Sequence, residues 1–194
     1  IQPLSTRYKD RENSIEPIVK TLIETIQSKP GNYLIFFPSY LYLNSVLEYW
    51  NHGNYGIPTI VQGTGMGDAE REAFLGSFKP GGSGSLVGFA VLGGIFSEGV
   101  DLKGDRLNGV LVVGVGLPQI GFERDLIKQH FSSKGKNGYD YAYVYPGMNK
   151  VLQAGGRLIR SEKDTGTIIL IDDRYLQHKY QSLLPDVWRR YTIL

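Results

Sequence analysis

The stretch at residues 33–39, Tyr-Leu-Ile-Phe-Phe-Pro-Ser, decides how this chain is expected to fold. Five large apolar residues follow one another without a polar residue between them, which is typical of a strand buried on both faces of a parallel sheet. Pro38 ends this strand, and Ser39 is a good N-cap for a helix that begins directly after it. The stretch therefore predicts the strand-then-helix unit of an α/β protein.

The rest of the chain repeats this alternation of apolar runs and helical periodicity. Further strands are predicted at residues 57–62, 86–92, 110–115 and 167–171, with a weaker one where Tyr139, Tyr141, Tyr143 and Tyr145 alternate. Helices are predicted at 14–28 (capped by Ser14, with Pro17 in its first turn), after Ser39, at 68–78 (capped by Asp68), at 122–131, at 147–160 and from Arg174 onward. The order favours an α/β domain, a mainly parallel sheet between two helical layers.

The composition narrows the class of protein. A net charge of +2 neither requires nor excludes nucleic-acid binding, because a groove can be locally basic in a balanced chain. The chain has no cysteine, which excludes disulfides and thiolate metal sites, and its apolar runs are too short for a membrane span. We see no domain boundary within 1–194, and because the chain opens at Ile1 rather than Met we expect a piece of a longer intracellular protein.

Ligands bind beyond the carboxyl ends of the strands in open parallel sheets. The loops expected at that edge are residues 38–39, 63–67, 93–101 and 114–119. Residues 93–102, Gly-Gly-Ile-Phe-Ser-Glu-Gly-Val-Asp-Leu, combine glycines that let backbone amides approach an anion with carboxylates that can bind a ribose or metal-bound water. An ordinary glycine-rich turn is the alternative.

A second segment with candidate ligand-binding side chains is residues 153–160, Gln-Ala-Gly-Gly-Arg-Leu-Ile-Arg. On a helix, Gln153, Arg157 and Arg160 share one face and could clamp phosphate oxygens. Gly155 and Gly156 each cost about 1 kcal/mol in a helix relative to alanine, which indicates that something packs closely there. A solvated basic stripe is the alternative.

These segments resemble the C-terminal RecA-like motor domain of superfamily 2 helicases of the DinG/XPD type. Ser97–Leu102 resembles motif V, Gln153–Arg160 resembles motif VI, residues 31–40 ending in Phe-Phe-Pro-Ser-Tyr resemble motif IV, and Asp164-x-Gly166 and Asp172-x-Arg174 also match. The motifs occur in order over essentially the whole chain, so the resemblance implies a three-layer RecA-like fold and a DNA helicase, expected to be cytoplasmic and to act in DNA repair.

The resemblance also implies roles for individual residues. Arg157 and Arg160 would act as arginine fingers on the γ-phosphoryl group, with Gln153 beside them. Gly99, Asp101 and Glu98 would lie at the nucleotide, and Glu98 together with Ser97 would couple that site to DNA. Ser39, Tyr40 and Thr64, and also Gln62, would lie along the single strand.

Two motifs of a complete ATPase are missing from the sequence. No Gly-x-x-x-x-Gly-Lys-Ser/Thr loop occurs, since Asp105 stands where the Gly99–Gly104 spacing would need lysine, and there is no Asp-Glu dipeptide. ATP and Mg²⁺ are therefore expected to be shared with an N-terminal RecA-like domain, and this chain alone is expected not to hydrolyse ATP. An iron–sulfur cluster, where the family has one, would lie outside this chain.

Other interpretations stay open. The chain could be a non-catalytic nucleotide- or nucleic-acid-binding module on the same fold, or the helicase-like half of a DinG-like nuclease, and RNA could replace DNA. His52, His130 and His178 show no metal-ligand spacing, so no metal site is expected on this chain. The four alternating tyrosines are expected to pack rather than to stack on bases. Arg7, Lys9 and Arg11 are expected to lie in a solvated linker.

Overall fold

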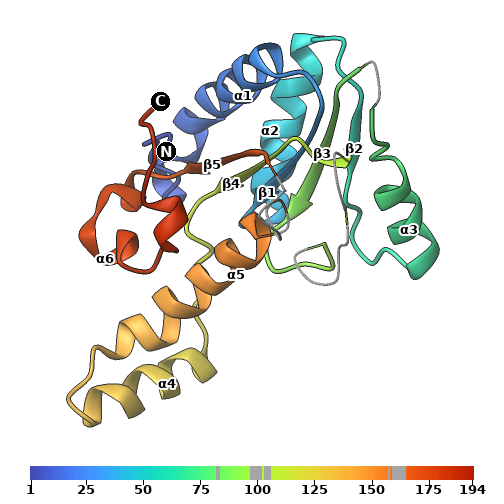
Figure 1. Ribbon diagram of the computed structural model, residues 1–194. Helices are drawn as coiled ribbons and strands as arrows, with labels where there is room; N and C mark the ends of the chain where they lie inside the picture. The colour runs from blue at the N-terminus through green and yellow to red at the C-terminus, as the bar shows by residue number, and fades with distance from the viewer. Residues whose placement is uncertain (82–83, 97–101, 103–105, 157, 159–164) are drawn as a thin grey trace.

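The computed structural model describes residues 1–81, 84–96, 102, 106–156, 158 and 165–194. Its centre is a parallel sheet of five strands in the order β2-β3-β1-β4-β5 (Figure 1). The strands are β1 (Asn32–Phe37), β2 (Thr59–Val61), β3 (Leu86–Val91), β4 (Gly109–Val113) and β5 (Thr167–Ile171). Each predicted apolar run of 33–37, 57–62, 86–92, 110–115 and 167–171 overlaps one of these strands, so the prediction of a parallel α/β sheet is confirmed.

The helices other than α4 cover both faces of this sheet (Figure 1). They are α1 (Arg11–Ser28), α2 (Tyr40–Gly53), α3 (Asp68–Gly76), α4 (Phe122–Ser133), α5 (Tyr145–Gly155) and α6 (His178–Gln181). Alternate residues of β1 enter opposite cores. Tyr33, Ile35 and Phe37 pack with α1 and α2, whereas Leu34 and Phe36 pack with α3, α5 and α6. This division of one fully buried strand between two cores produces the three-layer αβα arrangement.

The first residues of the chain lie along the outer edge of β5. The backbone N–H of Gln2 donates to the carbonyl of Leu170 at 2.9 Å, and Gln2 forms a parallel bridge with Ile171. Arg7 continues this contact with an ion pair to Asp173 at 2.8 Å. The prediction of a solvated linker is therefore wrong for this segment, because backbone pairing and a side-chain ion pair fix it to the sheet.

Two predicted helix starts are shifted in the structure. α1 begins at Arg11, and Ser14 lies inside its first turn, where its hydroxyl donates to the carbonyl of Arg11 at 2.6 Å. Ser14 therefore does not cap the helix, and Pro17 lies beyond the first turn. Asp68 is the first residue of α3, and Gly67 holds the N-cap position.

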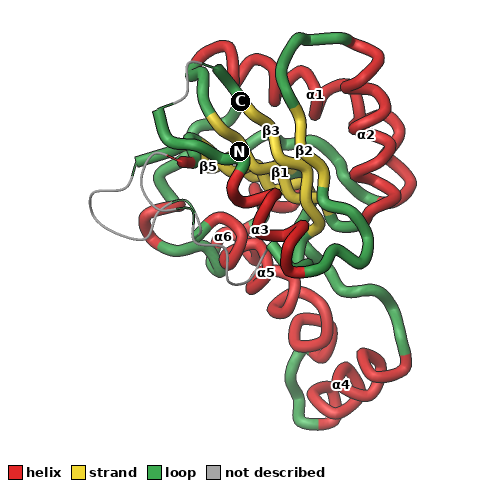
Figure 2. The backbone as a smooth tube through the Cα atoms, turned by 90° about the vertical axis from the view of Figure 1, so that its right-hand side faces the viewer, coloured by secondary structure: helices red, strands yellow, loops and turns green. Residues whose placement is uncertain are grey.

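The alternating tyrosines form a helix rather than a strand. Residues Asp140–Val144 make a π-helical turn that continues directly into α5. Tyr139 stacks on Tyr143 with ring centroids 5.0 Å apart, and Tyr141 meets Tyr145 edge-on at 5.0 Å. The tyrosines occur at every second residue, but each contacts the tyrosine four residues away, which is the spacing of neighbours on a helix. This turn and α4 form a hairpin that projects away from the sheet (Figures 1 and 2).

The last two predicted helices end or begin differently in the structure. α5 ends at Gly155, with Gly156 as its C-cap and Leu158 in a turn, so the predicted helix through residue 160 is too long. The region after Arg174 is a succession of short turns around the four-residue α6 rather than one long helix. None of the helices in the described part of the chain has the length and apolar character needed to cross a membrane.

Candidate nucleotide and nucleic-acid site

The carboxyl ends of all five strands lie at one edge of the sheet, because every strand pair is parallel. Four of these ends lead into the loops predicted from the sequence, at residues 38–39, 63–67, 93–101 and 114–119. The fifth, after β5, begins with Asp172. This edge therefore brings together segments that are more than 100 residues apart in the chain.

Ser39 and Tyr40 begin the contacts at this edge. Ser39 is the N-cap of α2, and its hydroxyl accepts a hydrogen bond from the backbone N–H of Tyr42 at 3.3 Å, as predicted for a cap. The hydroxyl of half-buried Tyr40 donates to the carbonyl of Gly63 at 3.2 Å. The start of α2 is thereby tied to the loop after β2. Thr64 is exposed in this same loop.

Gln62 braces Tyr40 from below. Its side chain is only 4% exposed. The amide donates to the Tyr40 hydroxyl at 2.9 Å, and the amide oxygen accepts from the backbone N–H of Val91 at 2.8 Å. Both ends of the amide thus have partners within the protein, so burial removes Gln62 from the surface on which a strand of DNA could lie. The expectation that it lies along the single strand is not supported.

The loop after β3 is held at both ends by buried side chains. Phe96 is fully buried and stacks on Phe74 with centroids 4.1 Å apart, and Leu102 is 4% exposed in the same core. Between them lie four predicted site residues that fall outside the described residues, namely Ser97, Glu98, Gly99 and Asp101. Phe96 and Leu102, on either side of these four residues in the sequence, are therefore buried in the same core.

The second predicted motif begins at the end of α5. Gln153 is exposed in the last turn of this helix. Arg157 and Arg160 lie outside the described residues. Since α5 ends at Gly155, Gln153 is the one residue of the three that lies on this helix among the described residues.

The close packing predicted at the glycine pair is present, and its partner is an aromatic ring. A Cβ atom on Gly155 would overlap the six-membered ring of Trp188, which lies in the C-terminal segment. The contact explains why the helix tolerates glycine there. It serves packing between α5 and the C-terminal segment rather than a ligand.

The loop after β4 is filled by the protein itself. Gly116 has φ +65°, and a Cβ on it would lie 2.7 Å from the carbonyl oxygen of Gly147 at the start of α5. The hydroxyl of buried Tyr175 donates to the carbonyl of Gly114 at 2.7 Å. Gly114 and Gly116 of this predicted loop therefore pack within the protein, whereas Gln119 at its end is exposed.

Asp172 and Arg174 form a buried ion pair at the end of β5. The sequence analysis noted these two residues only as a motif match and did not predict that they pair. Asp172 is fully buried and accepts hydrogen bonds from Arg174 Nε at 2.7 Å and Nη2 at 2.8 Å, and also from the Thr6 hydroxyl. Burial alone would raise the pKa of Asp172, but the hydrogen bonds and charge of Arg174 outweigh it and hold the pKa below its ordinary value. The Asp-x-Arg spacing was visible in the sequence, but the Thr6 partner was not.

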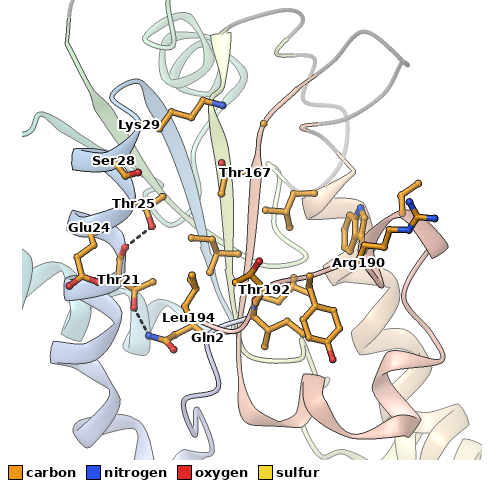
Figure 3. A pocket seen from close by; sticks show the side chains of 18 residues that line it. Gln2, Thr21, Glu24, Thr25, Ser28, Lys29, Thr167, Arg190, Thr192 and Leu194 are labelled. Carbon is orange, nitrogen blue, oxygen red and sulfur yellow. Dashed lines mark hydrogen bonds between the residues drawn. The ribbon is translucent and has the colours of Figure 1, made fainter.

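A groove of about 700 Å³ lies away from this edge, between α1, β5 and the C-terminal segment (Figure 3). Its lining runs from Lys29, just after α1, to Thr167 at the amino end of β5 and to Arg190. None of the predicted site residues that the structure describes lines it. Among the described residues there is also no group of three or more His, Cys, Asp or Glu side chains that could hold a metal ion.

Comparison with known proteins agrees with this geometry. A solved structure of apo XPD superposes with a TM-score of 0.78 at 19% identity, covering 98% of this chain and 38% of that one, which shows the RecA-like helicase fold. The ATP-dependent DNA helicase chl1 of Schizosaccharomyces pombe is 29% identical over 93% of this chain and 23% of its own length. The ATP-dependent DNA helicase DinG of Photobacterium profundum is 28% identical over 96% of this chain and 26% of its own length.

The chain thus spans about a quarter of the length of these curated relatives. The family described as "Helicase C-terminal domain" matches residues 22–191, which include every strand and helix from β1 to α6. With the parallel sheet and the motif order in agreement, the chain belongs to the helicase C-terminal domain family of DinG/XPD-type helicases.

Proposed function

We propose that this chain is the second motor domain of an ATP-dependent DNA helicase that acts in DNA repair in the cytoplasm. The proposal is supported by the family match over residues 22–191 and by the position of Tyr40 and Thr64 in loops at the carboxyl edge of the sheet. The names of the relatives supply the substrate class, because chl1 and DinG are both described as ATP-dependent DNA helicases.

The proposed division of labour places ATP and Mg²⁺ between this domain and an N-terminal RecA-like domain of the same protein. When bound, the nucleotide supplies the phosphoryl group that is transferred to water. Arg157 and Arg160 would neutralise charge that develops on that group, which in other NTPases is worth about 10³-fold or more in rate. Gln153 would stand beside them, at the exposed end of α5.

The segment anchored by Phe96 and Leu102 would connect the two ligands. Gly99, Asp101 and Glu98 would face the nucleotide, and Ser97 would face the DNA. Ser39, Tyr40 and Thr64 would form part of the single-stranded track, for which the exposed position of Thr64 and the half-buried ring of Tyr40 are suited. Movement of the cleft between the two motor domains would then move the strand.

ATP hydrolysis by the full-length protein tests this function, measured without nucleic acid, with single-stranded DNA and with RNA of the same sequence. We expect hydrolysis that DNA stimulates and RNA does not. Hydrolysis that is unaffected by either, or an absence of hydrolysis, would favour a non-catalytic binding module. Stimulation by RNA alone would support an ATP-driven motor that moves on RNA rather than on DNA.

A further inference from the structure

Lys150 is a half-buried lysine that lies outside the segments resembling helicase motifs. It lies on α5, three residues before Gln153, and therefore on a neighbouring part of the same helix surface. Met148 and Val151 on the adjoining face are buried in the core and fix the rotation of the helix. Lys150 is thereby directed towards the loop that follows β3.

Gly93 makes room for this side chain. It directly follows Val91 and Leu92 at the end of β3 and has φ +76°, a conformation that favours glycine. A Cβ at this position would lie 2.9 Å from both Cδ and Cε of Lys150 and 3.2 Å from its Nζ. The lysine stem therefore lies across the backbone of Gly93, and the ammonium group is held beside the entry to the segment at 97–102.

The ammonium group has no hydrogen bond or ion pair with any residue in the described part of the chain. Two other lysines have a partner, since Lys179 pairs with Asp140 and exposed Lys20 lies 3.9 Å from Glu24. A charge that is partly withdrawn from water gains most from a partner of opposite charge. The position thus suits an anion supplied by a ligand.

The surroundings identify the kind of anion. Gly94, the next residue, lies against the amide of Gln62, since a Cβ there would be 2.9 Å from Gln62 Nε2. The same amide holds Tyr40 at 2.9 Å. The ammonium group therefore lies against Gly93, one residue before the glycine that packs on the amide holding Tyr40. A strand of DNA that passes Tyr40 carries a phosphate beside each base, and lysine binds phosphate as a compact point charge.

We propose that Lys150 binds a phosphate oxygen at this edge of the sheet, and that the glycine at position 93 is required so that its side chain can reach there. The inference rests on the proposed function. The phosphate belongs either to the DNA backbone or to the nucleotide, because both lie at this edge in the proposed arrangement. These two sources give different results in one set of measurements.

The experiment compares the full-length native protein with Lys150→Met, the charge-preserving Lys150→Arg, and the exposed control Lys20→Met. Single-stranded DNA affinity is measured at several salt concentrations, and KM and kcat for ATP are measured at saturating DNA. If Lys150 contacts the DNA backbone, Lys150→Met reduces the slope of log affinity against log salt by about 0.7, while KM for ATP stays at the native value.

If Lys150 contacts the nucleotide, Lys150→Met raises KM for ATP by about tenfold and leaves the salt slope unchanged. Lys150→Arg restores most of the affected quantity in either case, which a purely structural role would not predict. A salt slope and a KM both equal to those of Lys20→Met would overturn the proposal. Should Lys150→Met not fold, Lys150→Gln is measured in the same way.

Failure of the proposed function is separable from failure of this inference. A native protein that binds single-stranded DNA but does not hydrolyse ATP would refute the motor, while the salt slope would still decide whether Lys150 contacts that strand. A native protein that hydrolyses ATP normally but shows neither effect on substitution would refute the role of Lys150 alone.

Discussion

The side-chain amide of Gln62 donates a hydrogen bond to the hydroxyl of Tyr40 at 2.9 Å, and the same hydroxyl donates to the carbonyl of Gly63 at 3.2 Å. The ring of Tyr40 is therefore held at a fixed angle on the edge where the single strand is proposed to lie. Gln62 is buried and positions the Tyr40 side chain, whereas half-buried Tyr40 has part of its surface available to contact DNA.

Removing the ring of Tyr40 is expected to weaken DNA binding. Stacking of a base on an aromatic side chain contributes about 1–3 kcal/mol, so Tyr40→Ala in the full-length protein should raise the Kd for single-stranded DNA about 5-fold to 150-fold. Tyr40→Phe keeps the ring and should have a much smaller effect. Fluorescence anisotropy with a labelled oligonucleotide measures both. Equal affinities for native protein and Tyr40→Ala would exclude Tyr40 from the track.

The ion pair of Asp172 with Arg174 is expected to stabilise the fold. Asp172→Asn leaves the guanidinium of Arg174 without its buried counter-charge, and such a change typically costs about 3–5 kcal/mol. Urea denaturation followed by circular dichroism at neutral pH measures the loss. Asp186→Asn, which removes a pair with Arg189 in which Asp186 is 91% exposed, is the matched control and should cost little.

The same pair gives the fold a defined dependence on pH. The pKa of Asp172 is lower in the folded chain than its ordinary value of 3.8, because the charge and hydrogen bonds of Arg174 outweigh the effect of burial. The folded state therefore binds fewer protons here than the unfolded state, and this stabilisation is complete above pH 3.8 and is lost as the pH falls through the lower folded value. The difference in unfolding free energy between native and Asp172→Asn should shrink below that pH. A difference that grows on acidification would contradict the assignment.

Gly155 is expected to resist substitution because of Trp188. Alanine would normally stabilise a helix relative to glycine by about 1 kcal/mol, but at Gly155 its Cβ would overlap the indole ring. We expect Gly155→Ala to destabilise the domain by about 1–3 kcal/mol. Gly76, the last residue of α3, is the control, since a Cβ there meets no atom within 4 Å and Gly76→Ala should be neutral or stabilising.

A double-mutant cycle separates this contact from a general effect of losing glycine. If the overlap with the ring is the cause, Gly155→Ala should cost less in a Trp188→Leu background than in the native one. An equal cost in both backgrounds would show that the indole is not what excludes alanine.

The parallel sheet was predictable because its strands are continuous apolar runs, and such runs require burial on both faces. Residues 33–37 are fully buried in the structure, as their composition demands. The helix starting after Ser39 was predictable for a local reason, since the serine hydroxyl caps α2. Interactions of this kind are encoded within a few residues.

The errors arise where distant residues decide the outcome. Ser14 has the chemistry of a cap, yet its hydroxyl lies against that of Tyr42 and the helix starts earlier. The alternation of Tyr139 with Tyr141 fits a strand by spacing, but each ring contacts the tyrosine four residues further on, which is helical separation. The contact of Gly155 with Trp188 joins segments that local sequence cannot relate.

The candidate site divides in the same way. Resemblance to known motifs proposed the residues that carry chemistry, and the structure places Tyr40 and Thr64 at the expected edge. Burial of Gln62 and the position of Lys150 over Gly93 were not predictable, because both depend on how strands and α5 are packed. The sequence signal for the contact of Lys150 with Gly93 was the glycine itself, two residues after the end of β3.

This domain is proposed to supply arginine to an ATP site that another domain completes. The most direct test is the rate of ATP hydrolysis by the full-length protein at saturating single-stranded DNA, compared for native, Arg160→Ala and the exposed control Arg190→Ala, which lies in the groove at the other end of the sheet. We expect Arg160→Ala to remain folded and to lose about 10³-fold in kcat, with Arg190→Ala unchanged. A folded Arg160→Ala protein that hydrolyses ATP at the native rate would contradict the account.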